Sequence, residues 1–134
     1  MDKGVFDAML AAARQAAPLE ACGLLGGRPG QATVFCELRN ADASGEHYRM
    51  LPEEQFAAVK GFRAKGLAIT AIWHSHPATP ARMSGEDLRL AYTPGVVYII
   101  LSLASPQQPE MRGFMVEEGT PREVAITVLE HQTC

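Results

Sequence analysis

The sequence predicts an α/β (α+β) fold in which helices pack around one β-sheet. Two observations lead to this class. Two stretches carry the apolar repeat of amphipathic helices, and at least five others are short apolar or β-branched runs typical of strands. The 134 residues match the length of one domain, and 47% of them are hydrophobic. We therefore expect residues 1–134 to form a single domain with a core that needs no disulfide.

The first half of the chain is predicted as a helix, a hairpin and a second helix. Residues 3–16 have apolar residues at helical spacing, and Pro18 ends that helix. Pro52 suits the first turn of the second helix, and Gly66 is a stop signal. The elements expected between these limits are strands at 20–27 and 32–38, a Gly-rich turn at 26–30, a polar loop at 39–45, a short strand at 46–50 and a helix at 53–65.

The second half begins with residues 67–73, which are almost wholly apolar, as expected of a central strand covered on both faces. Two prolines and the lack of any periodicity predict a loop over 74–83. A helix should then run from Ser84 to about Tyr92. Further strands are expected at 96–103, 111–117 and 122–129, with a turn at 104–110.

Composition limits the partners. The net charge is −3 and the basic residues are scattered, which argues against binding to a nucleic acid backbone. No apolar stretch approaches the roughly 20 residues of a membrane span, and the N-terminal residues lack a signal-peptide core. Cys22, Cys36 and Cys134 form no close pair, so we expect reduced thiols in a cytoplasmic protein. The alternative for Cys22 is that it lines the site described next.

The stretch Trp73-His74-Ser75-His76-Pro77 closes the predicted apolar strand. Because side chains alternate faces along a strand, His74 and His76 point to the same side. Pro77 turns the chain away and leaves room beside the two imidazoles. The pattern supplies two ligands of a metal site, although two histidines at an exposed strand end are often only solvated.

The third ligand is expected to be Asp87, in the first turn of the next predicted helix. Two histidines and one carboxylate leave a fourth tetrahedral position for water, which is the pattern of a catalytic Zn²⁺ site. Zinc lowers the pKa of such a water to about 7. The segment Ser84-Gly85-Glu86-Asp87 is equally well explained as a helix N-cap with an acid at the third position. On that alternative, a capping Asp87 would not be a ligand.

Hydrolysis of an amide also needs a group that takes the proton of the attacking water and passes it to the leaving amine. Glu20, at the start of the first predicted strand, is our candidate. Spacing alone does not select it over Glu46, Glu53 or Glu86. Ser84 is placed to donate a hydrogen bond to the oxyanion that forms as the carbonyl is attacked.

The remaining candidates have weaker signals. His47 and His131 are expected at the surface rather than in the site, and Trp73 is expected in the core beside it. Arg82 and Met83 lie in the predicted 74–83 loop, where they could contact substrate.

These residues resemble a known family. His74-x-His76-Pro77, six further residues and Ser84-x-x-Asp87 match the JAMM motif, HxHPx6SxxD, of the MPN-domain (Mov34/MPN/PAD-1) metalloproteases. Residues 18–26 (PLEACGLLG) resemble the segment in which that family carries its catalytic glutamate. Similar features are Asn40 after the second predicted strand, Tyr48 near Pro52, and Tyr92-x-Pro94-Gly95 before the apolar run.

The resemblance implies one zinc ion held by His74, His76 and Asp87, with Glu20 as general acid and base. It implies that Ser84 steadies the tetrahedral intermediate. It also implies the cytidine-deaminase-like MPN fold, a mixed sheet flanked by helices. The chain is most similar to small stand-alone prokaryotic members, some of which cleave at the C-terminus of ubiquitin-like β-grasp sulfur-carrier proteins. The expected function is therefore hydrolysis of a peptide or isopeptide bond on such a carrier.

Two other functions stay open at this point. Some MPN domains are non-catalytic binding or scaffold modules, although those lack ligands that this sequence keeps. A JAMM peptidase could also act on a different small peptide.

Overall fold

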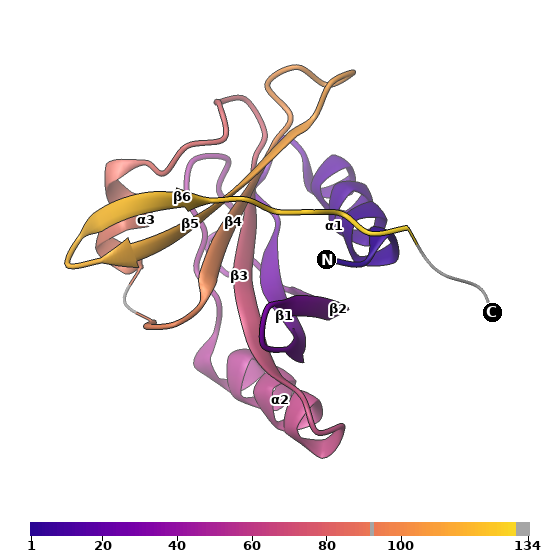
Figure 1. Ribbon diagram of the computed structural model, residues 1–134. Coiled ribbons are helices and arrows are strands. Elements are labelled where there is room, and N and C mark those ends of the chain that lie inside the picture. Colours follow the sequence, from indigo (N-terminus) through magenta and orange to yellow (C-terminus); the bar gives the residue numbers. More distant parts are fainter. Residues whose placement is uncertain (92, 131–134) are drawn as a thin grey trace.

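A six-stranded mixed sheet with the order β2-β1-β3-β4-β5-β6 forms the centre of the molecule (Figure 1). The structure is a computed structural model that describes residues 1–91 and 93–130. Its elements are α1 (Lys3–Ala16), β1 (Cys22–Arg28), β2 (Gln31–Leu38), α2 (Pro52–Ala64), β3 (Ala68–His76), α3 (Gly85–Leu90), β4 (Val97–Ser102), β5 (Glu110–Glu117) and β6 (Thr120–Val124). The mixed α/β class expected from the sequence is confirmed.

The helices cover opposite faces of this sheet. Helix α1 packs Val5 and Met9 into a core cluster with Trp73 and Ile99. Helix α2 packs Phe62 on the other face, in a cluster with Leu24. Because neighbouring residues of a strand point to opposite faces, the strands are apolar on both, as expected for a covered sheet. Trp73 is fully buried, as predicted.

The pairing of β3 with β4 is parallel, while the other strand pairs are antiparallel. Parallel neighbours need a crossover connection, and here the crossover contains α3. The first turn of α3 is thereby brought over the carboxyl end of β3. That end of β3 carries His74 and His76, and the first turn of α3 carries Asp87.

Strand β3 is longer than predicted, because the loop expected over 74–83 begins only at Pro77. His74 lies opposite Cys22 of β1 and beside Ile100 of β4, and His76 lies beside Ser102. Pairing with β1 and β4 at His74, and with β4 at His76, therefore holds the two histidines on a strand rather than on a loop. Helix α3 is correspondingly short, with Ser84 as its N-cap, and the predicted end at Tyr92 lies outside the described residues.

The short strand predicted at 46–50 is wrong, since these residues have no regular secondary structure. Their backbone groups bond to a side chain instead of to a strand. The Asn40 amide donates to the carbonyl oxygen of His47 at 3.0 Å, and its oxygen accepts from the backbone amide of Arg49 at 3.1 Å.

The last predicted strand, 122–129, is also wrong in its bounds. Strand β6 stops at Val124, and the chain then crosses toward the N-terminus (Figure 1). The backbone amide of Lys3 donates to the carbonyl oxygen of Leu129 at 2.8 Å. The backbone amide of Leu129 donates to the carbonyl oxygen of Met1, also at 2.8 Å. These bonds to the N-terminal residues replace pairing with β5.

The Gly-rich turn predicted at 26–30 is confined to Pro29 and Gly30, because Gly26 and Gly27 belong to β1. A β-carbon on Gly26 would lie 2.7 Å from the Phe62 ring. The glycine is explained by this close approach of α2 rather than by a turn. In the described part of the chain, no helix has both the length and the hydrophobicity needed to cross a membrane.

Candidate metal centre and active site

Three buried side chains converge at the carboxyl end of β3. His74 Nε2 and His76 Nε2 lie 3.1 Å apart. The Asp87 carboxylate places Oδ1 at 3.3 Å from His74 Nε2 and Oδ2 at 3.2 Å from His76 Nε2. All three residues are less than 10% exposed. The structure thus brings together the three ligands predicted from the sequence, in a group able to hold a metal ion.

The spacing of the two histidine nitrogens is close to that of two ligands of a tetrahedral metal ion. Ligands at about 2.0–2.1 Å from zinc lie about 3.3 Å from one another in a tetrahedron. The two nitrogens are 3.1 Å apart, and each has a different oxygen of the Asp87 carboxylate at 3.2 or 3.3 Å. Two imidazole nitrogens facing each other beside a buried carboxylate also call for a positive charge between them. A proton or a metal cation satisfies that need.

The ring of His76 is oriented by its second nitrogen. His76 Nδ1 donates to the carbonyl oxygen of Pro80 at 2.9 Å, which leaves Nε2 as the nitrogen that faces the cluster. Burial alone would lower the pKa of His76, but the hydrogen bonds to Asp87 and Pro80 outweigh it and raise the pKa. His74 is more deeply buried, and that burial lowers its pKa. The neutral form able to bind a metal is therefore favoured at His74.

Asp87 caps α3 and faces the histidines at the same time. Its Oδ2 accepts a hydrogen bond from the backbone amide of Ser84 at 2.9 Å, and its own amide donates to Ser84 Oγ at 3.0 Å. Capping α3 and facing the histidines are therefore compatible for Asp87, and its part as a ligand stays a prediction. Burial would raise the pKa of Asp87, but the hydrogen bonds from the histidines hold it well below its usual range. The carboxylate stays charged.

Glu20 is the buried glutamate of the site. Glu20 lies two residues before Cys22, and Cys22 is directly opposite His74 on β3. Because side chains alternate faces along an extended chain, the Glu20 side chain lies on the same face of the sheet as the histidines. Glu20 is 4% exposed, and its Oε1 has no hydrogen-bond partner among the described residues. Burial raises its pKa to about 7, with the positive charge of His76 opposing this and the negative charge of Asp87 adding to it.

The other glutamates considered for the role of general base are less buried than Glu20. Glu46 and Glu53 are exposed, and Glu86 is half-buried. The side chain of His47 is 38% exposed and pairs with Asp42, so His47 is not part of the ligand group. His131 lies outside the described residues. Arg82 is exposed and Met83 packs against a small apolar cluster, so contact of either with a substrate stays a prediction.

Cys22 is adjacent to the site but unreactive. It is fully buried opposite His74, and its thiol is free. Burial, with a smaller contribution from the charge of Glu20, raises its pKa to about 12. A thiol in that state is not a nucleophile at neutral pH, and Cys22 is not part of the candidate metal group.

Tyr48 and Asn40, which the sequence singles out only by the family resemblance, both contact residues of the site. The ring of Tyr48 stacks on His74, with centroids 4.6 Å apart and an angle of 27° between the planes. Asn40 donates to the carbonyl oxygen of Glu20 at 3.2 Å. Neither contact follows a helical or strand period, so the pattern of the sequence alone does not reveal them.

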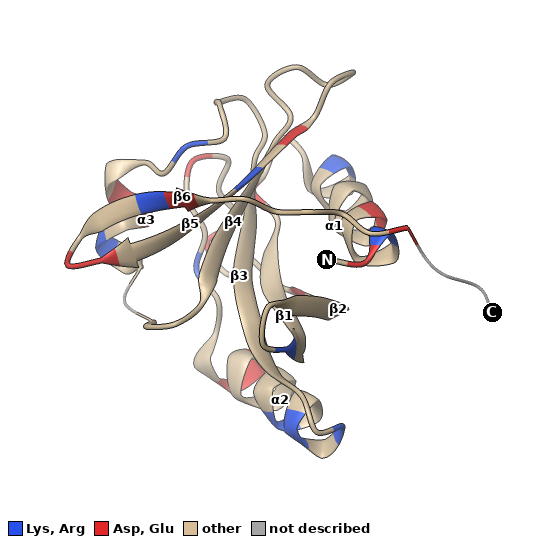
Figure 2. Ribbon diagram, in the orientation of Figure 1, with Lys and Arg blue, Asp and Glu red and all other residues tan. Residues whose placement is uncertain are grey.

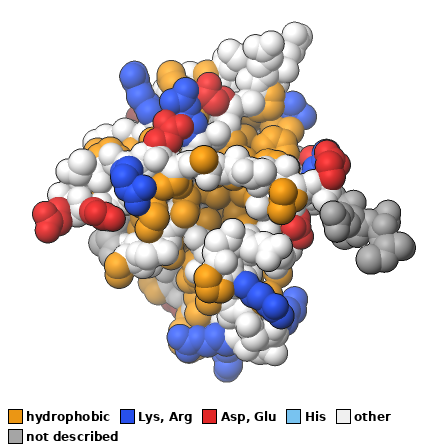
Figure 3. All heavy atoms as spheres, in the orientation of Figure 1, with side chains coloured by type: hydrophobic (Ala, Val, Ile, Leu, Met, Phe, Trp, Pro, Cys, Tyr) orange, Lys and Arg blue, Asp and Glu red, His pale blue; other side chains and the backbone are white. Residues whose placement is uncertain are grey.

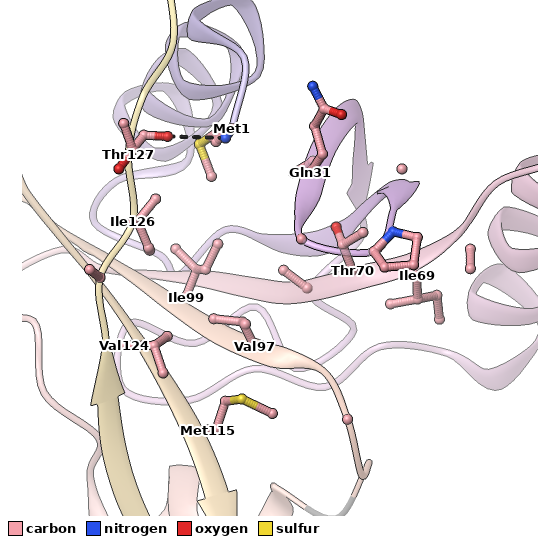
Figure 4. Close-up of a pocket in the computed structure, with 18 of the residues that line it drawn as sticks. Met1, Gln31, Ile69, Thr70, Val97, Ile99, Met115, Val124, Ile126 and Thr127 are labelled. Carbon is pink, nitrogen blue, oxygen red and sulfur yellow. Dashed lines mark hydrogen bonds between the residues drawn. The ribbon is translucent and has the colours of Figure 1, made fainter.

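Cavities lie on both faces of the sheet. One of about 430 Å³ lies beside the site, between α2 and α3, with Tyr48 and Glu86 in its walls. A larger one of about 840 Å³ lies on the opposite face, where Ile99, Val97 and Ile126 line it beneath the segment that follows β6 (Figure 4). Figure 3 shows hydrophobic side chains gathered on that face. The smaller cavity adjoins the candidate metal group through Tyr48, whose ring lines the cavity and stacks on His74.

The fold and this site define a class of protein. Two buried histidines and an aspartate that can hold one metal ion, beside a buried glutamate of raised pKa, form the side-chain set of a metal-dependent hydrolase.

Comparisons with known proteins agree with that class. Residues 2–117 match the family described as prokaryotic homologues of the JAB domain. CysO-cysteine peptidase of Mycobacterium tuberculosis is 32% identical over 128 residues, which cover 94% of this chain and 88% of that protein. Desampylase of Pyrococcus furiosus is 30% identical over 111 residues, which cover 82% and 76%.

Solved structures give the same result. A protein from Desulfitobacterium hafniense superposes with a TM-score of 0.89 at 45% identity, covering 98% of this chain and 94% of that one. A JAB1/MPN domain protein from Archaeoglobus fulgidus superposes with a TM-score of 0.67 at 25% identity, covering 96% and 97%. The chain belongs to the prokaryotic JAB-domain family, as its JAMM motif predicts. Its relatives' names confirm the predicted class of enzyme, a hydrolase that acts as a peptidase.

Proposed function

We propose that this protein is a zinc-dependent peptidase that hydrolyses a peptide or isopeptide bond at the C-terminus of a ubiquitin-like β-grasp sulfur-carrier protein in the cytoplasm. The observation that carries the proposal is the buried His74, His76 and Asp87 group with Glu20 on the same face of the sheet. Two nitrogen ligands and one oxygen ligand form a donor set that suits zinc and leaves a position open.

In this proposal His74, His76 and Asp87 hold the ion. A bound zinc ion would polarise the carbonyl and lower the pKa of a bound water to about 7. Glu20 takes the proton of the attacking water and delivers it to the leaving amine. A pKa of about 7 suits both steps, because the carboxylate can accept the proton and the carboxylic acid can release it near neutral pH.

Ser84 has a hydroxyl proton to spare for the oxyanion. Its Oγ already accepts a hydrogen bond from the Asp87 backbone amide. A serine hydroxyl has two acceptor positions and one donor, so this bond does not consume the O–H. We infer that the O–H donates to the carbonyl oxygen as negative charge develops there, which stabilises the transition state.

The choice of substrate is supported by the relatives and by the short connections of this chain. One relative is named a CysO-cysteine peptidase, and another, from Thermus thermophilus, a probable TtuB-protein conjugate cleaving protease. Helix α3 ends at Leu90 and β4 begins at Val97, which leaves no room for a long insertion that would grip a large partner. Lys and Arg are distributed over several elements (Figure 2), so the proposal rests on the buried site rather than on surface charge.

The test uses a panel of β-grasp carriers that end in Gly-Gly. Each carrier is extended by a single cysteine, or joined to a lysine side chain, and incubated with the zinc-loaded protein. Mass spectrometry should show the free Gly-Gly terminus of at least one substrate, and the Glu20→Gln variant should leave that substrate intact. Stoichiometric zinc with no cleavage of any conjugate would favour the scaffold alternative. Cleavage of unrelated peptides only would favour the other peptidase.

A further inference from the structure

The two candidate ligand histidines are held in different ways. His76 is oriented by the hydrogen bond from its Nδ1 to the Pro80 carbonyl oxygen. His74 is 1% exposed, yet its Nδ1 has no hydrogen-bond partner among the described residues. Metal-binding histidines usually donate that second N–H to a carboxylate or a carbonyl group, which fixes the ring. Some other contact must therefore orient the His74 ring.

The Tyr48 ring makes a contact able to do this. Its centroid lies 4.6 Å from that of His74 with only 27° between the planes, a stacked geometry. The rings of His74 and His76 are tilted by 57° at 4.9 Å. His74 thus contacts a nearly parallel ring, Tyr48, and an inclined ring, His76. Rotation about its side-chain bonds would have to displace Tyr48.

We propose that Tyr48 is a positioning residue that orients the His74 imidazole by stacking, in place of the usual second-nitrogen hydrogen bond. The inference rests on the proposed metal centre for its function but on the apo geometry for its structure. Tyr48 touches neither substrate nor metal in this role. It acts through the direction in which His74 presents Nε2 to His76 and Asp87.

A positioning side chain must itself be fixed, and Tyr48 lies on a segment without regular structure. The Asn40 side chain holds this segment on both sides of Tyr48. It donates to the carbonyl oxygen of His47 and accepts from the backbone amide of Arg49, at 3.0 and 3.1 Å. The carbonyl oxygen of Arg49 also accepts from the amide of Ala41 at 2.8 Å. The backbone of Tyr48 is therefore clamped by its two neighbours.

Tyr48 also forms a wall between the metal group and the cavity of about 430 Å³ beside it. Its ring covers one face of the His74 imidazole. Loss of the ring would open that face to the cavity and leave a space in which the imidazole could turn. The expected defect is a misdirected ligand, not an unfolded protein.

The test compares Tyr48→Leu, which removes the ring, with Tyr48→Phe, which keeps it. The control is Phe35→Leu. Phe35 stacks on Trp73 in a similar way, with centroids 5.4 Å apart and 29° between planes, but on the α1 face of the sheet. It reports the general cost of losing a stacked ring. Zinc affinity is measured by competition with a chelator, and the cobalt-substituted proteins are compared by their visible absorption spectra.

Loss of a residue that orients a ligand typically lowers metal affinity about 10- to 100-fold. We expect a loss of this size, with an altered cobalt spectrum, for Tyr48→Leu. Tyr48→Phe should stay within about threefold of the wild type, and so should Phe35→Leu. Equal losses for Tyr48→Leu and Phe35→Leu, or wild-type affinity and spectrum for Tyr48→Leu, would overturn the proposal.

A second measurement needs neither metal nor substrate. In the metal-free protein, NMR of the imidazole protons should show one sharp His74 signal set for the wild type and Tyr48→Phe. Tyr48→Leu should broaden it or shift it toward the average of several rotamers. An unchanged signal set in Tyr48→Leu would refute the positioning role. Failure of the wild type to cleave any carrier would instead contradict the proposed function and leave this result standing.

Discussion

Ser84 and Asp87 exchange two hydrogen bonds, one from each backbone amide to the side chain of the other residue, at 2.9 and 3.0 Å. The same Asp87 carboxylate lies 3.2–3.3 Å from the Nε2 atoms of His74 and His76. An ionised carboxylate has about four acceptor positions, so capping and ligation do not compete. The cap instead fixes the carboxylate in the direction that the cluster requires.

Replacement of Asp87 by asparagine should separate these two roles. The amide oxygen of Asp87→Asn can still accept from the Ser84 amide, so the helix keeps its cap. The negative charge is lost, and we expect zinc affinity to fall by more than the roughly 10- to 100-fold that loss of a partner of a ligand costs. Asp87→Ala should lose affinity similarly and also about 1 kcal/mol of metal-free stability. Chelator competition and urea unfolding measure the two quantities. An Asp87→Asn variant that binds zinc like the wild type would exclude Asp87 as a ligand.

Two substitutions of Ser84 should distinguish its cap from its proposed role at the oxyanion. Both Ser84→Ala and Ser84→Gly remove the O–H, and kcat should fall about 10²- to 10³-fold in each. Glycine is a better N-cap than alanine, so Ser84→Gly should lose only a few tenths of a kcal/mol where Ser84→Ala loses about 1 kcal/mol. Steady-state kinetics and thermal unfolding test this. If kcat followed stability across the two variants, Ser84 would be a cap and nothing more.

The sequence predicted those parts of the site that depend on local geometry. The two-residue period of a strand puts His74 and His76 on one face, and the capping pattern begins a helix at Ser84. The choice of Glu20 over Glu46, Glu53 or Glu86 depends on the pairing of β1 with β3 and on burial, which are properties of the folded chain. Local spacing carries no information about either.

The failed predictions have a related cause. The segment 46–50 has the composition of a strand, but its backbone is bonded to the Asn40 side chain. The segment 125–129 is apolar enough for a strand, but its bonds go to residues 1 and 3. A nearby side chain satisfies the first backbone and the distant N-terminus satisfies the second, and neither partner follows from a strand pattern. The stacking of Tyr48 on His74 was not predictable for the same reason.

Glu20 should lower the stability of the metal-free protein in a pH-dependent way. Burial raises its pKa from 4.5 to about 7, so the folded chain keeps a proton that the unfolded chain releases over this range. Stability therefore falls as pH rises from 4.5 to 7. Glu20→Gln does not titrate and should be roughly 2–3 kcal/mol more stable than the wild type above pH 7, with no difference below pH 4.5. Urea unfolding across pH gives the profile.

The same variant should lose activity while it gains stability. Removal of a general acid and base costs about 10²- to 10⁴-fold in rate, so kcat of the zinc-loaded Glu20→Gln enzyme should fall by that amount with zinc content unchanged. Glu46→Gln is the control, because Glu46 is exposed and should change neither quantity. If Glu20→Gln raised the free energy of unfolding equally at all pH values, the charge of Glu20 would not be the cause of that gain in stability.

Asn40 should be the most sensitive residue of the loop that carries Tyr48. Its Nδ2 faces the carbonyl oxygens of Glu20, Ser44 and His47 at 3.0–3.4 Å. Asn40→Ala removes these bonds and should cost roughly 2–4 kcal/mol. Asn40→Asp keeps the shape but turns a carboxylate oxygen toward three carbonyl groups, so it should cost at least as much at pH 7.

The pH dependence of Asn40→Asp provides the check. Repulsion by the carbonyl oxygens raises the pKa of the introduced carboxyl group, so part of the lost stability should return as pH falls and the group gains a proton to donate. Asn40→Ala should show no such recovery relative to the wild type. Arg39→Ala, which breaks only an exposed ion pair with Glu54, should stay within about 0.5 kcal/mol of the wild type. Urea unfolding at pH 7 and at pH 4 measures all three. If Asn40→Asp matched the wild type at pH 7, the three carbonyl contacts would not be holding the loop, and the clamp on Tyr48 would need another source.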